Sequence, residues 1–118
     1  MTATFRVTDK YELQALHRVL FQAQFPEHAD DRYIPGSPLL ANMANRLVDV
    51  LATQDDRWSE WRAAEKHPDK VSIAERHLIA NPLWSKMSRQ ERVAQVHNQL
   101  APLVPSKELV SKLVGDEV

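Results

Sequence analysis

Histidine is the residue of this sequence best suited to metal binding or proton transfer, and its five copies are His17, His28, His67, His77 and His97. None has another histidine three or four residues away, so no helix presents two imidazoles to one ion. The chain contains no cysteine, which excludes thiolate catalysis and cysteine-bound zinc. We therefore predict no catalytic residue, no metal site and no cofactor. His77 and His97 lie on or beside apolar helix stripes and are expected to be core or boundary histidines.

The loop before Ser37 contains the candidate anion site of the chain. Pro35-Gly36 predicts a type II turn, and the helix that follows it would present N–H groups to an anion. The candidate ligands are Arg32, Gly36 and Ser37, and a small-ligand or enzyme site near Tyr33–Ser37 stays open as an alternative. The competing interpretation is that Ser37 only caps its own helix. An acidic cluster earlier in the loop lacks the spacing and the glycine of an EF-hand, so we expect it to be solvated: Glu27, His28, Asp30 and Asp31.

A basic helix face is the candidate nucleic-acid interface. Four polar side chains are predicted to share this face, with Lys86 just before the helix: Arg89, Arg92, Gln95 and Gln99. Arginine and glutamine are residue types that hydrogen-bond guanine and adenine edges. The connection that precedes the helix, residues 81–87, is too long for the turn of a helix-turn-helix motif. We expect an ordinary solvated face, with a nucleic-acid-binding regulator that uses Arg89 and Arg92 as the alternative.

The three tryptophans are the candidate partner-binding residues. Trp58 and Trp61 lie three residues apart on a predicted helix, and Trp84 lies in a proline-bounded loop. A core position is the usual one for tryptophan. Tryptophan and arginine are nevertheless enriched at the energetic centres of protein interfaces. The predicted partner-binding set is therefore Trp58, Trp61, Trp84, Arg89 and Arg92.

Length and composition place the chain among ordinary globular domains. Its 118 residues predict one helical domain over 1–118; 43% of them are apolar, 26% are charged, and the formal net charge is −1. Two glycines are too few for many hairpin turns, which argues against a β fold. No stretch approaches the ~18 apolar residues of a membrane span, and residues 1–11 lack the apolar core of a signal peptide. Without cysteines for disulfides, we expect a cytoplasmic protein that does not bind membranes.

The helical segments are marked by caps and by apolar stripes. A first helix is predicted over about 9–24, with Asp9 at its start. The next is predicted over about 38–53, with Ser37 as its N-cap and Pro38 as its first residue. This second helix is apolar over most of its circumference. It is therefore predicted to be the central helix, packed on more than one side.

Shorter helices are predicted in the second half of the chain at about 56–66, 72–81, 88–101 and 107–114. Pro68 is expected to close the first of them. Ser72 and Ser88 each have a glutamate three residues later, which is the capping-box spacing of a helix start. Gly115 follows the last helix and suits a C-terminal cap.

The predicted fold is all-α, a compact bundle of five or six short helices around the helix at 38–53. The alternative is an α+β domain in which residues 2–7, where apolar and polar side chains alternate, form a strand. The predicted function is a non-enzymatic protein-interaction module, such as an adaptor, regulator or accessory subunit, because the sequence has no catalytic constellation. The partner is expected to be another protein or a second copy of the chain. A homodimer is expected because the short helix at 107–114 needs a surface to cover.

Overall fold

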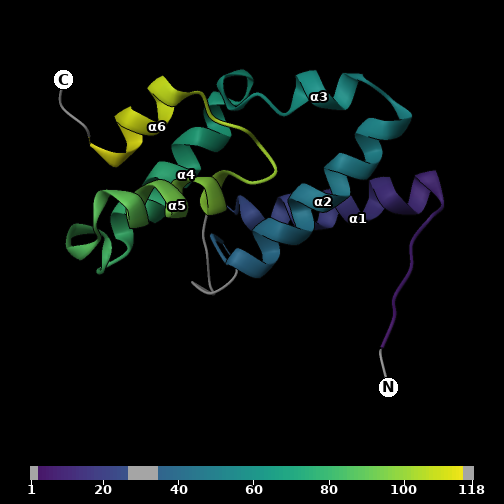
Figure 1. The fold of residues 1–118 in the computed structure, drawn as a ribbon, viewed down its shortest axis with the longest axis horizontal. Coiled ribbons are helices and arrows are strands. Elements are labelled where there is room, and N and C mark those ends of the chain that lie inside the picture. Colours follow the sequence, from purple (N-terminus) through teal and green to yellow (C-terminus); the bar gives the residue numbers. More distant parts are fainter. Residues whose placement is uncertain (1–2, 27–34, 116–118) are drawn as a thin grey trace.

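The computed structural model describes residues 3–26 and 35–115, and these residues form six α-helices and no strand (Figure 1). The all-α prediction is confirmed. Residues 3–9 run without regular structure into the first helix, so the strand alternative is wrong for this segment. The helices are α1 (Lys10–Gln24), α2 (Pro38–Gln54), α3 (Arg57–Trp61), α4 (Pro68–Ala80), α5 (Arg89–Leu100) and α6 (Lys107–Val114), with 3-10 turns η1 (Ala64–Lys66) and η2 (Trp84–Lys86).

Helix α2 is the central element of the bundle. Ser37 caps it by accepting a hydrogen bond from the backbone N–H of Leu40, and Pro38 is its first residue, as predicted. The helix packs against α1, α3 and α5, so the prediction that neighbours contact it on several sides is confirmed. Its buried side is formed by leucine, valine and small alanine side chains: Leu40, Ala41, Ala44, Leu47, Val48 and Leu51.

Two predicted boundaries in the middle of the chain are wrong. The helix expected over 56–66 ends at Trp61, and residues 64–66 form the 3-10 turn η1. Helix α4 begins at Pro68, four residues before the predicted start at Ser72, because proline is well tolerated at the first helical position. Pro68 therefore opens a helix that we expected to begin later.

The break after α3 has a tertiary cause. The Ala64 N–H donates to the Val104 carbonyl over 3.0 Å, and the Val104 N–H donates to the Arg62 carbonyl over 2.6 Å. These bonds form an isolated parallel bridge between Ala63 and Val104. Backbone groups that would have continued the helix are thus paired with a segment forty residues away.

Helices α5 and α6 begin and end where their caps predict. The Glu91 N–H donates to Ser88 Oγ and the Ser88 N–H donates to the Glu91 carboxylate, which completes the predicted capping box. The bond from the Ser88 backbone lowers the pKa of Glu91. Gly115 closes α6 with a positive φ of 84°. Val110, Leu113 and Val114 are buried within the chain, so the reason we gave for a homodimer no longer applies.

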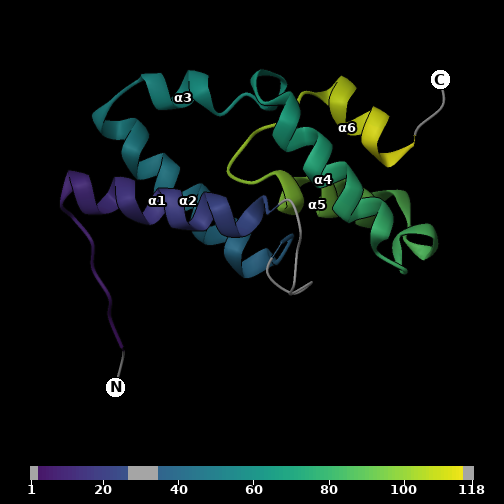
Figure 2. The same cartoon turned by 180° about the vertical axis from the view of Figure 1, so that it is seen from behind.

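The core divides into a large and a small cluster. The large cluster lies among α4, α5, α6 and the end of α1, and it includes Phe25, Ile73, Leu78, Val96, Leu100 and Leu113. The small cluster consists of Leu13, Leu47 and Leu51 and lies in the hairpin formed by α1 and α2. This hairpin lies at one end of the molecule, with α4, α5 and α6 at the other (Figure 2). The hairpin thus has a small core of its own, and no other described helix packs on one of its sides.

Candidate interaction surfaces

Trp58 and Trp61 belong to an aromatic cluster that joins α3 to α1. The ring centroids of Trp58 and Trp61 lie 4.9 and 5.1 Å from that of His17, with both indoles edge-on to the imidazole. Phe21 lies one turn further along α1, 5.3 Å from Trp61. Both tryptophans are half-buried. Their main observed role is to attach α3 to the bundle, and the interface role predicted for them stays a prediction.

His17 is the buried titratable group of this cluster. His17 is 7% exposed, although the sequence pattern did not predict that it is buried. Burial is the main cause that lowers the pKa of His17, because the imidazolium would lose its hydration, and the charge of Arg18 lowers the pKa further. Folding therefore favours the neutral form of the His17 imidazole, which contacts both indoles.

The free energy of unfolding is expected to fall as the pH drops below about 6.5, the usual pKa of histidine. The unfolded chain then binds a proton that folded His17 resists, so protonation favours unfolding. A His17→Phe variant should lose less stability than the wild type between about pH 7 and pH 5. Urea titrations across this range measure the difference. His97→Asn is the control, since that imidazole is exposed; identical pH profiles for wild type and His17→Phe would contradict the assignment.

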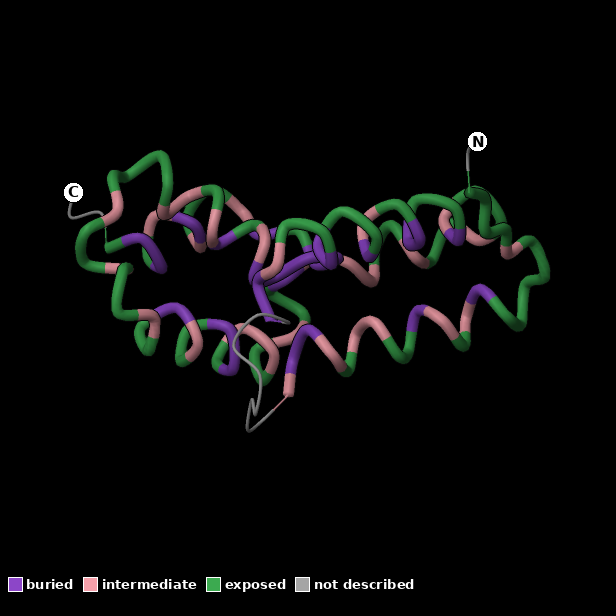
Figure 3. The backbone as a smooth tube through the Cα atoms, turned by 90° about the horizontal axis from the view of Figure 1, so that it is seen from below, coloured by how far each residue is buried: buried purple, intermediate pink, exposed green. Residues whose placement is uncertain are grey.

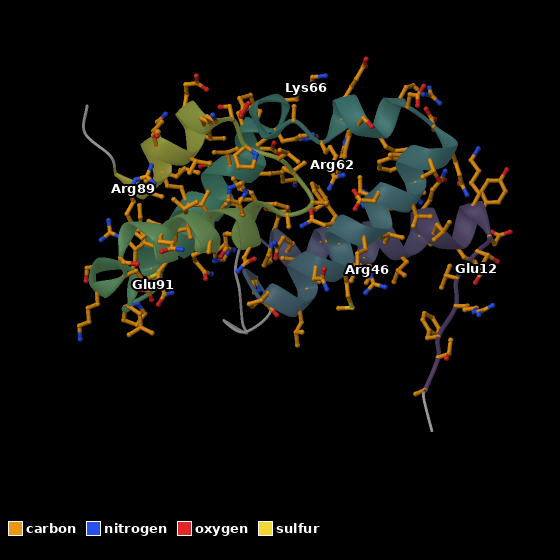
Figure 4. All side chains as sticks on the ribbon, viewed as in Figure 1. Glu12, Arg46, Arg62, Lys66, Arg89 and Glu91 are labelled. Atoms are coloured by element: carbon orange, nitrogen blue, oxygen red, sulfur yellow. The ribbon has the colours of Figure 1, made fainter. Side chains whose placement is uncertain are left out.

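Arg92 and Trp84 contact each other and are both half-buried. Arg92 Nε donates to the Trp84 carbonyl over 3.0 Å, and one terminal nitrogen of Arg92 donates to the Val114 carbonyl over 3.1 Å. The guanidinium also lies 5.0 Å from the centre of the Trp84 ring. Arg92 thus joins α5 to η2 and to the end of α6. Arg89, one turn earlier on α5, is exposed and lies beside α6 (Figure 4).

The helix face expected to be solvated is partly buried. Gln99 is 3% exposed and Gln95 is half-buried, because this side of α5 packs against Gly36 and the end of α1. Gln24, which is fully buried, accepts a hydrogen bond from the Gly36 N–H over 3.0 Å and donates to the Asn98 carbonyl. Sequence reasoning missed Gln24, since a lone glutamine on an amphipathic helix carries no signal of its burial.

Most of the described hydrogen-bonding groups of the candidate anion site already bond to other groups of the protein. The Gly36 N–H donates to Gln24, and the Gly36 carbonyl accepts from Gln95 Nε2 over 3.4 Å. Ser37 caps α2, which is the competing interpretation given above, and Pro38 has no N–H to offer. Arg32 and Tyr33 lie outside the described residues, as does the acidic cluster at 27–31.

The described histidines do not converge. His77 is half-buried and its Nε2 lies 3.2 Å from the Pro26 carbonyl, which confirms the boundary position predicted for it. His97 is exposed, so the same prediction is wrong there. His67 Nε2 lies 2.6 Å from the Trp61 carbonyl. Among residues 3–26 and 35–115, no group of three or more histidine, aspartate or glutamate side chains is arranged to hold a metal ion.

The outer side of α2 carries an exposed apolar stripe, which we call the α2 apolar face: Leu39, Met43 and Val50. Their side chains are 76%, 48% and 45% exposed and recur at i, i+4 and i+11, which places them on one side of the helix. Arg46 lies within the same stripe and points to the lower side of α2 (Figure 4). From below, no other helix lies in front of α1 and α2 (Figure 3). The longest of the described helices therefore presents an exposed apolar stripe that Arg46 interrupts.

These features define the described part of the chain as a small all-α protein. No protein-family model matches the chain, and no curated protein or solved structure is significantly similar to it. Within the described ranges, none of the helices has both the length and the apolar character needed to cross a membrane.

Proposed function

We propose that this protein is a non-enzymatic interaction module of the cytoplasm, an adaptor, regulator or accessory subunit, that binds a partner protein through the α2 apolar face. The observation that supports this proposal most strongly is the exposure of Leu39, Met43 and Val50 on one side of a single helix. Exposed apolar patches with polar residues at their edges are common at protein interfaces. The absence of cysteine is consistent with a reducing compartment.

The energetics favour a helix-face interface. Complete burial of one large apolar side chain contributes about 1.5–3 kcal/mol, so three such residues supply a substantial part of the free energy that association requires. Helix α2 is held by α1, α3 and α5, so its outer side is already ordered before a partner arrives. Binding would then cost little conformational entropy. The partner is another protein or a second copy of the chain.

The other two functions are less favoured by the geometry. A nucleic-acid-binding regulator would need Arg92 at base edges, whereas its guanidinium donates to the carbonyls of Trp84 and Val114. A small-ligand site near Tyr33–Ser37 would need the N–H of Gly36, which donates to Gln24. The α2 apolar face requires neither group to change partner.

A photo-cross-linking side chain at Met43 tests the proposal. In cells that produce the protein, we expect a discrete adduct that mass spectrometry identifies as another protein or a second copy. Combining Leu39→Lys with Val50→Lys should reduce its yield about tenfold or more, since 1.4 kcal/mol of lost contact is a factor of ten.

The matched control is Ile79→Lys on α4, which adds the same charge at another exposed apolar position. This variant should leave the adduct yield unchanged. An adduct that survives the double substitution, or the absence of any discrete adduct at Met43, would overturn the proposal.

A further inference from the structure

An arm without regular structure, residues 3–9, leaves the start of α1 and runs away from the bundle (Figure 1 and Figure 2). Val7 packs against the small core cluster of the hairpin, which fixes the base of the arm. Phe5 lies two residues further out and is 85% exposed. Its ring is therefore in water, although a phenylalanine side chain can bury about 150–250 Å² of surface against a partner.

The arm leaves the hairpin on the side where the α2 apolar face lies. Arg46, within the stripe of that face, points to the lower side of α2, and the arm descends on the same side (Figure 4). Leu39 and Met43 are four residues apart, which is about 6 Å along a helix. Alternate side chains of an extended segment are about 6.6–6.8 Å apart, so Ala3 and Phe5 match this spacing. The chain thus carries both an exposed apolar face and an exposed apolar segment that fits it.

The same side of the hairpin carries one unpaired charge of each sign. Glu12 lies on α1 and Arg46 on α2, and both point to the lower side of the hairpin (Figure 4). Among the residues that the structure describes, neither side chain has an ion-pair partner. In a two-fold dimer each contact occurs twice, with the roles of the two copies exchanged. This side of the hairpin is therefore electrostatically complementary to a second copy of itself.

We propose that the partner of the α2 apolar face is a second copy of the chain, and that each copy covers the face of the other with its arm. This inference rests on the proposed function, because it concerns the same face. Residues 3–7 span about 13 Å when extended, which exceeds the 8–10 Å between the axes of packed helices. Two Phe5 side chains bury about 300–500 Å², a substantial part of the roughly 1,000 Å² that a specific interface requires.

Sedimentation equilibrium of the full chain tests the inference by measuring the dimer dissociation constant. Phe5→Lys should weaken the dimer about tenfold or more, because the aromatic contact is lost in both copies at once. Phe5 is exposed in the single chain, so this variant should keep the helical circular dichroism of the wild type. Tyr11→Lys is the matched control, since it adds the same charge at an aromatic residue of α1 that is 75% exposed and lies outside the arm. It should leave the dissociation constant unchanged.

Charge reversal tests the two-fold arrangement. Glu12→Arg and Arg46→Glu should each weaken the dimer about tenfold or more, because each variant places like charges together. A chain that carries both substitutions restores opposite charges and should recover most of the affinity. In the purified protein, a photo-cross-linker at Met43 should attach to the arm of an isotope-labelled second copy.

Three results would overturn the inference: a strict monomer at millimolar concentration, a Phe5→Lys dimer as tight as the wild type, or a double charge reversal as weak as the single ones. A Met43 adduct with the arm of its own chain would also overturn it. A monomer whose Met43 cross-links to a different protein in cells would sink this inference and leave the proposed function standing. The two failures are therefore distinguishable.

Discussion

Replacing Gly36 with alanine is expected to lower the free energy of unfolding by about 3 kcal/mol. Gly36 has a φ of 79°, a left-handed conformation that disfavours any side chain. A methyl group there would overlap the side-chain oxygen of Gln99 and lie 2.8 Å from Gln95 Nε2. Backbone strain and overpacking therefore act together, and urea denaturation measures their sum.

Gly115→Ala is the matched control for Gly36→Ala. Gly115 has a similar φ of 84°, but among the described residues a methyl group there would meet the Arg92 guanidinium alone, at 4.0 Å. We expect a loss of about 1 kcal/mol from the backbone alone. Adding Gln99→Ala to Gly36→Ala makes room for the new methyl group, so the two substitutions should be non-additive. Equal losses at the two glycines would show that the Gln99 contact carries no energy.

Arg62→Met is expected to lower the free energy of unfolding by about 2 kcal/mol. Its guanidinium donates to the Pro102 carbonyl over 3.1 Å, to Asp49 over 2.6 Å and to Asn45 over 3.2 Å. The side chain is only 17% exposed and lies between α2 and the end of α3 (Figure 4). Methionine keeps part of the apolar stem but leaves the buried end of this bond network unpaired.

Arg57→Met is the control for Arg62→Met. Arg57 also makes a short ion pair, 2.7 Å to Asp55, but its side chain is 88% exposed. Such pairs contribute little because water and salt screen them, so we expect no measurable change in the urea midpoint. A loss at Arg57 as large as that at Arg62 would contradict the view that burial of the Pro102 contact matters.

The helices could be predicted because their determinants are local. Asp9, Ser37, Ser88 and Ser106 each accept hydrogen bonds from the first turn of a helix, and Gly115 ends the last one. Caps depend on residues three or four apart, so they can be recognised in one sequence. The apolar stripes between the caps then predicted a bundle around α2. These features by themselves determined the fold class.

Tertiary contacts decided the rest. The end of α3 depends on how Arg62 and Ala64 pair with Val104, and the burial of Gln24 and Gln99 depends on α1 and α5 meeting at Gly36. Arg92 looked like a surface residue until α6 placed a carbonyl within its reach. The α2 apolar face is likewise exposed because none of the other described helices packs on it. Helix caps use bonds between near neighbours, whereas these positions gain or lose water only when distant segments pack together, and local sequence does not encode that packing.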